Sequence, residues 1–132
     1  FSDISSTLYK LKKYEEANIV NKECLPIAEE MKNIEAIFEC KVREAKITFK
    51  TTKNSELQIA YSIKPLEKML QDTKKEEQIA TINYELSIMS HEIRQTKMMK
   101  KYKTEAIKLY KILYSKKPII NYLKNIDELY KL

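Results

Sequence analysis

The stretch Tyr14-Glu15-Glu16-Ala17 opens a run in which small and apolar residues return at helical spacing: Ala17, Val20, Cys24, Ile27, Ala28 and Met31. Ala60 and Ala106 open later runs of similar kind, so a small residue recurs every forty-odd residues. A small residue lets two helices cross closely, and recurrence at such a period is typical of stacked helical hairpins. We therefore expect a helical array that binds other molecules rather than transforming them.

Glycine is absent from the 132-residue chain. Phosphate-binding loops and dinucleotide-binding turns need glycine, because the backbone must approach the anion or adopt positive φ. Tight turns between β-strands also favour it. The composition therefore excludes Walker-type and Rossmann-type sites and favours an all-α chain. With 43% apolar residues, residues 1–132 are expected to form a single domain. Because the chain begins with Phe1 rather than methionine, we expect that domain to be part of a longer protein.

Hydrophobic periodicity predicts about six helices, among them residues 14–31 and 34–49 and a long run over 79–93. Pro65 is expected either to interrupt the helix that begins near Ser55 or to start a new turn, and Pro118 to occupy the first position of the last helix. Four small residues are expected where helices cross: Ala17, Ala45, Ala60 and Ala106.

The segment Leu8-Tyr9-Lys10-Leu11-Lys12-Lys13-Tyr14-Glu15-Glu16-Ala17 resembles the tetratricopeptide repeat family, and the similarity extends over about residues 5 to 50. The resemblance implies a right-handed stack of about three helical hairpins, whose first helices form a concave surface for a peptide or a partner helix. Two departures stand out. The period exceeds the usual repeat of about 34 residues, and the glycine usual in the first helix is absent, with Ala45 as a candidate in its place.

A second segment, Met89-Ser90-His91-Glu92-Ile93-Arg94, is similar to the phosphoacceptor box of sensor histidine kinases. That resemblance implies an alternative function, a histidine phosphotransfer or dimerisation module in which His91 accepts the phosphoryl group. The chain departs from the kinase pattern, because Gln95-Thr96 replaces the threonine-proline that follows the arginine, and no glycine-rich ATP lid is present.

The formal net charge is +6, from 25 basic and 19 acidic residues. Most lysines alternate with glutamates, which indicates a solvated helix face and speaks against nucleic acid as the partner. The densest basic stretch follows Lys97. The candidate binding residues are Tyr84, His91, Lys97, Lys100 and Lys101.

Two cysteines, Cys24 and Cys40, are too few and too far apart for a zinc site, so neither a metal nor a cofactor is expected. Both lie among apolar residues at helical spacing. They are interpreted as reduced core residues of a cytoplasmic protein, with a disulfide as the alternative. No apolar run approaches the length needed to cross a bilayer.

The sequence thus predicts a non-enzymatic scaffold that binds a protein or peptide and belongs to a larger regulatory or signalling protein. No residue is assigned a catalytic role in this interpretation. Self-association of the domain is left open.

Overall fold

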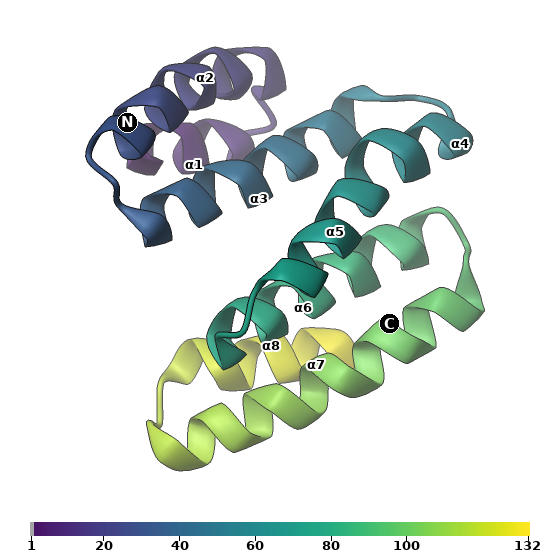
Figure 1. Ribbon diagram of the computed structural model, residues 1–132. Coiled ribbons are helices and arrows are strands. Elements are labelled where there is room, and N and C mark those ends of the chain that lie inside the picture. The colour runs from purple at the N-terminus through teal and green to yellow at the C-terminus, as the bar shows by residue number, and fades with distance from the viewer. Residues whose placement is uncertain (1) are drawn as a thin grey trace. The chain divides into compact units, whose positions relative to one another are not determined.

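The computed structural model describes residues 2–132, and over that range it contains helices and no strand (Figure 1). The expected all-α class is confirmed. The elements are α1 (Ser2–Lys10), α2 (Tyr14–Glu30), α3 (Ile34–Thr51), α4 (Ser55–Gln58), η1 (Ile59–Ile63), α5 (Lys64–Asp72), α6 (Glu76–Glu92), α7 (Thr96–Lys116) and α8 (Ile120–Tyr130). Across the described residues, no helix combines the length and the apolar character that crossing a lipid bilayer requires.

Three turns between helices close in the same way, through one residue with positive φ: Lys12 at 61°, Lys32 at 55° and Arg94 at 61°. The next residue then donates its N–H to a carbonyl five residues back, as in Lys13 to Leu8 at 2.9 Å and Gln95 to Ser90 at 2.9 Å. This is the Schellman closure, which usually has glycine at the positive-φ position. In a chain without glycine, lysine and arginine adopt that conformation instead.

Asparagine begins two of the helices. The Asn33 side chain accepts a hydrogen bond from the N–H of Ala36 at 3.1 Å, and the Asn54 side chain accepts from Glu56 at 2.8 Å. These bonds satisfy N–H groups that have no partner within the helix. Asn33 directly follows the positive-φ residue Lys32, so one short turn both ends α2 and begins α3.

Pro65 shapes the helical segment from Ser55 to Asp72. Proline has no N–H, and its ring collides with the carbonyl four residues earlier in an α-helix. The chain responds with the π-helix η1, in which hydrogen bonds span one residue more, and Pro65 lies in the first turn of α5. The predicted interruption is therefore a widened turn rather than a break.

Pro118 does not occupy the first helical position, as the sequence had suggested. The helix α8 begins at Ile120, and Pro118 lies in the link that follows α7. Lys117 has φ −149° and ψ 106°. This extended backbone is what the proline ring favours in the residue before it, so the proline ends α7 rather than starting α8.

The chain divides into two compact units, residues 1–62 and 63–132. In the first unit α1, α2 and α3 pack on one another. Buried polar groups join these helices: Ser5 Oγ donates to the carbonyl of Ala17 at 2.9 Å, Asn21 Nδ2 donates to the carbonyl of Cys40 at 2.9 Å, and Arg43 Nη1 donates to Asn21 Oδ1 at 3.0 Å. These bonds fix how the helices sit against each other, because breaking one would leave a buried polar group unpaired.

In the second unit α6 and α7 form the most extensive helix pair, and α5 and α8 pack beside them. One cluster of the buried core there consists of Ala80, Ala106, Leu109, Tyr110, Leu113 and Leu129. Tyr110 contacts two other tyrosines, with ring centroids 6.2 Å from Tyr84 and 5.7 Å from Tyr122. The unit therefore combines closely approaching alanines with large aromatic rings that fill the remaining space.

Three of the four alanines expected at helix crossings are buried: Ala17, Ala45 and Ala106. Ala60 is exposed, so that prediction is wrong. The residue belongs to η1, where the widened turn changes which side chains face inward. The starts of helices keep a more regular period than the alanines, because α2, α4 and α7 begin about 41 residues apart.

Replacing Ala106 by leucine should overpack the contact between α6 and α7 and lower the free energy of unfolding by about 1–3 kcal/mol. Ala60→Leu is the matched control, and because Ala60 is exposed its effect should stay within about 0.5 kcal/mol. Urea denaturation followed by circular dichroism measures both. Equal effects at the two positions would contradict the assigned packing.

Glycine at position 94 should stabilise the protein. The positive φ of Arg94 costs a residue with a side chain on the order of 1 kcal/mol, and glycine avoids that cost. Part of this gain is offset, because glycine has more conformational entropy in the unfolded chain. We expect Arg94→Gly to raise the free energy of unfolding by about 0.5 kcal/mol. Lys108→Gly, inside α7, should instead lower it by about 1 kcal/mol. A loss of stability in Arg94→Gly would count against this account of the turn.

Candidate functional site

The net positive charge of the chain lies entirely in its second unit. Residues 63–132 contain 15 basic and nine acidic residues, a surplus of six, whereas residues 1–62 contain ten of each. The first unit is therefore formally neutral, and the second is basic. Such an imbalance attracts anionic partners to the second unit.

The helix α7 carries most of this surplus, with seven lysines and one acidic residue, Glu105. Five exposed lysines fall within an arc of about 100° when the helix is viewed along its axis at 3.6 residues per turn. We call this set the lysine face: Lys97, Lys100, Lys101, Lys108 and Lys111. The opposite side of α7 is buried and includes Met99, Tyr102, Ala106 and Leu113. Burial of the apolar side thus turns the lysines toward solvent.

Most of the lysine face has no acidic partner. Among residues 2–132, Lys97, Lys100 and Lys108 make no ion pair with an aspartate or glutamate. Lys101 and Lys111 lie over aromatic rings instead, with Nζ 5.3 Å from the ring centroid of Tyr102 and 5.7 Å from that of Tyr130. The salt bridge of α7, from Lys116 to Glu76 at 3.0 Å, lies outside this face. The five positive charges therefore repel one another with little compensation.

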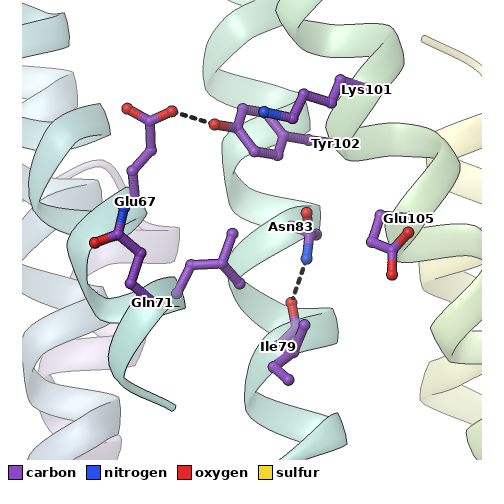
Figure 2. A pocket seen from close by; sticks show the side chains of 8 residues that line it. Glu67, Gln71, Ile79, Asn83, Lys101, Tyr102 and Glu105 are labelled. Atoms are coloured by element: carbon purple, nitrogen blue, oxygen red, sulfur yellow. Dashed lines mark hydrogen bonds between the residues drawn. The ribbon is translucent and has the colours of Figure 1, made fainter. Parts of the chain in front are cut away.

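A pocket of about 530 Å³ adjoins one edge of the lysine face, at Lys101 (Figure 2). Its lining comes from three helices of the second unit: Glu67, Leu70 and Gln71 of α5, Ile79 and Asn83 of α6, and Lys101, Tyr102 and Glu105 of α7. Asn83 and Tyr102 are buried, whereas Gln71, Lys101 and Glu105 are exposed. The pocket is therefore a recess with a buried floor and a charged rim.

Hydrogen bonds hold the floor of this pocket in place. Figure 2 shows the Tyr102 hydroxyl, which donates to the Glu67 carboxylate and so joins α7 to α5. Asn83 Nδ2 donates to the carbonyl of Ile79 in its own helix at 2.9 Å. In the same view the Asn83 oxygen lies on the side away from Ile79. The recess thus offers carboxylate and amide oxygens beside the lysine ammonium group.

The pKa of Tyr102 is raised above its usual value, first because burial disfavours the phenolate and then because the hydroxyl donates to Glu67. Burial likewise raises the pKa of Tyr110 to about 12. The pKa of Tyr84 is also raised, by burial and by its hydrogen bond to Glu128. All three tyrosines therefore remain protonated at neutral pH, and Tyr84 and Tyr102 donate hydrogen bonds to carboxylates.

The structure brings together three of the five binding candidates, Lys97, Lys100 and Lys101, on one face of α7. Tyr84 is half-buried and packs against Tyr110, so it belongs to the core region. His91 is exposed in the last turn of α6 and does not line the pocket. The sequence reasoning missed Glu67 and Asn83. Asn83 could have been found from its position, because it is a polar residue one turn after Ile79, next to the apolar stripe of α6.

Among residues 2–132, no three histidine, cysteine, aspartate or glutamate side chains are grouped so that they could hold a metal ion. Comparison of the chain with protein-family models, with curated proteins and with solved structures gave no match.

Tyr102→Phe should lower the free energy of unfolding at neutral pH by about 1–2 kcal/mol, because it removes a hydrogen bond to a carboxylate. It should also flatten the alkaline pH dependence. The raised pKa of folded Tyr102 gives stabilisation that is complete below about pH 10, the unfolded value, and is lost as the pH rises toward the folded value.

Urea denaturation at about pH 8 and about pH 11, on either side of the unfolded tyrosine pKa, tests this. From the lower to the higher pH, the free energy of unfolding should fall more in the wild type than in Tyr102→Phe. Tyr61→Phe is the control, because Tyr61 is exposed at 59%. An alkaline loss in Tyr102→Phe equal to that of the wild type would contradict the assignment.

Proposed function

We propose that this chain is a non-enzymatic helical-repeat module that binds an acidic polypeptide segment through the lysine face of α7. The observation that carries the proposal is the position of five exposed lysines on one side of a single helix, with three of them lacking an acidic partner among residues 2–132. An acidic segment laid along α7 would replace repulsion between lysines with attraction.

A tetratricopeptide-like, right-handed stack of about three hairpins is the architecture we propose for the module. Two features support it. Within each unit, a helix packs on its neighbours in the chain, and α1 also contacts α3 as α6 contacts α8. The helices α2, α4 and α7 begin at nearly even intervals of about 41 residues. Regular helical arrays of this type act through extended surfaces rather than enclosed catalytic sites, which agrees with a scaffold in a larger regulatory protein.

An acidic polypeptide fits the lysine face better than nucleic acid does. Single-stranded nucleic acid is bound with exposed aromatic rings on which bases stack. The aromatic residues of α7 do not serve this purpose, because Tyr102 and Tyr110 are buried in the core and Tyr114 is half-buried. Beside the face, the exposed ring of Tyr130 in α8 already has the Lys111 ammonium group over it. Glutamate or aspartate side chains need only charge and hydrogen-bond donors, which lysine ammonium groups supply.

The expected affinity is modest. An exposed ion pair contributes on the order of 0.2–1 kcal/mol, so five lysines alone correspond to a Kd of roughly 0.2 mM or weaker. Binding should weaken further as salt is added, because the charges are exposed. Measurements therefore belong at low ionic strength, with the salt dependence as part of the result.

The test uses fluorescence anisotropy with three labelled probes of equal length: a polyglutamate peptide, a polyglutamine peptide and a single-stranded oligonucleotide. The full chain should bind polyglutamate and not polyglutamine. The triple variant Lys97→Gln, Lys101→Gln, Lys108→Gln should bind polyglutamate about tenfold more weakly. Lys64→Gln, Lys68→Gln, Lys124→Gln is the matched control, because it removes the same charge from exposed positions of the same unit; it should retain binding within about twofold.

Two outcomes would overturn the proposal. Equal losses in the two triple variants would show that net charge, and not the lysine face, controls binding. Tighter binding of the oligonucleotide than of polyglutamate would assign the face to nucleic acid. His91→Gln should leave polyglutamate binding unchanged, because His91 lies in α6, outside the lysine face.

A further inference from the structure

The sulfur atoms of Cys24 and Cys40 lie 3.2 Å apart, and both residues are free thiols. Cys24 belongs to α2 and Cys40 to α3, two helices that pack on each other in the first unit. The Cys40 S–H donates a weak hydrogen bond to the Cys24 sulfur. A disulfide places two sulfurs about 2.05 Å apart, so about 1 Å of further approach would bring the thiols to bonding distance.

The backbone around this pair is held by other contacts. Asn21, one turn before Cys24 in α2, donates to the carbonyl of Cys40 at 2.9 Å. Arg43, one turn after Cys40 in α3, donates to the Asn21 side chain at 3.0 Å. These bonds keep the two cysteine positions facing each other, because sliding one helix along the other would break both.

We propose that Cys24 and Cys40 form an oxidative modification site, at which a hydroperoxide converts the thiol pair into an intramolecular disulfide. In the first step, the Cys24 sulfur attacks one peroxide oxygen. The O–O bond breaks, Cys24 becomes a sulfenic acid, and hydroxide leaves with the thiol proton as water. In the second step, the Cys40 sulfur attacks the sulfenic sulfur of Cys24 and the S–S bond forms. The S–O bond breaks, and the hydroxide leaves with the Cys40 proton as a second water. The two thiols together give up two electrons and two protons.

The order of these steps follows from exposure. Cys40 is fully buried, whereas Cys24 retains 8% of its surface, so peroxide from solvent meets Cys24 first. Burial, followed by the hydrogen bond to Cys24, raises the pKa of the Cys40 thiol to about 11. Cys40 therefore stays protonated at neutral pH and acts as the resolving partner. The thiolate is the reactive form of cysteine, so the oxidation should be slow compared with that of exposed, activated thiols.

The disulfide would tie α2 to α3 with a short covalent loop. A disulfide between Cys24 and Cys40 restricts the conformations of the unfolded chain and should therefore raise the melting temperature of the first unit. The residues involved lie in the formally neutral unit and take no part in the lysine face. This site is therefore independent of the proposed binding function.

The experiment exposes the full chain to hydrogen peroxide at neutral pH. The product should be a monomer that has lost two hydrogens by intact mass and that shows no free thiol with Ellman's reagent in denaturant. Trypsin should then release residues 23–32 and 33–41 as one cross-linked peptide that dithiothreitol separates, because Lys22, Lys32 and Lys41 bound these two segments. The oxidised protein should melt several degrees above the reduced one, and dithiothreitol should reverse the shift.

Cys24→Ala and Cys40→Ala each remove one partner, and neither should form the cross-linked peptide or show a reversible rise in melting temperature. The wild-type peptide map is decisive even if a variant folds poorly, because it needs no substitution. Disulfide-linked dimers, oxidation of each cysteine to a sulfinic acid without a cross-link, or two thiols that remain free under peroxide would each overturn the proposal.

Discussion

The contact between α6 and α7 is the interaction on which the second unit depends. Ala80 of α6 and Ala106 of α7 are both fully buried in the same core cluster, and small side chains there allow the two helices to approach closely. Because one side of α7 is buried in this contact, five of its seven lysines lie together on the opposite side. The same packing places Asn83 and Tyr102 together at the floor of the pocket. The packing of α6 on α7 thus determines both which residues form the core of this unit and which lysines are exposed on its surface.

The two units use polar residues in different ways. In residues 1–62, Asn21 and Arg43 are buried, and the hydrogen bond between them holds α2 against α3. Such interior bonds favour one arrangement of helices over its alternatives, because a slipped arrangement would leave polar groups without partners. In residues 63–132, the surplus of positive charge lies on α7, mostly on exposed lysines, and it stabilises little by itself. The first pattern holds helices together, and the second leaves charge exposed to solvent.

Much of the helical organisation could be predicted from the sequence, because hydrophobic periodicity and turn residues act locally. The range of α3 and the grouping of Lys97, Lys100 and Lys101 follow from spacing along a helix. The position of Ala60 could not be predicted in this way, because the π-helix that exposes it arises from proline sterics five residues later. The pocket could not be predicted either. Glu67 and Tyr102 come from α5 and α7, and only the packing of both beside α6 makes them neighbours.

The glycine-free turns also bear on how the chain folds. In the unfolded state, lysine and arginine seldom visit the left-handed region that Lys12, Lys32 and Arg94 adopt in the native protein. These turns are therefore poor places for folding to begin. The helices must first gain enough contact with each other to compensate for the rare backbone conformation, and the turns close afterwards. The hairpins of this protein are consequently expected to assemble from their helices toward their turns.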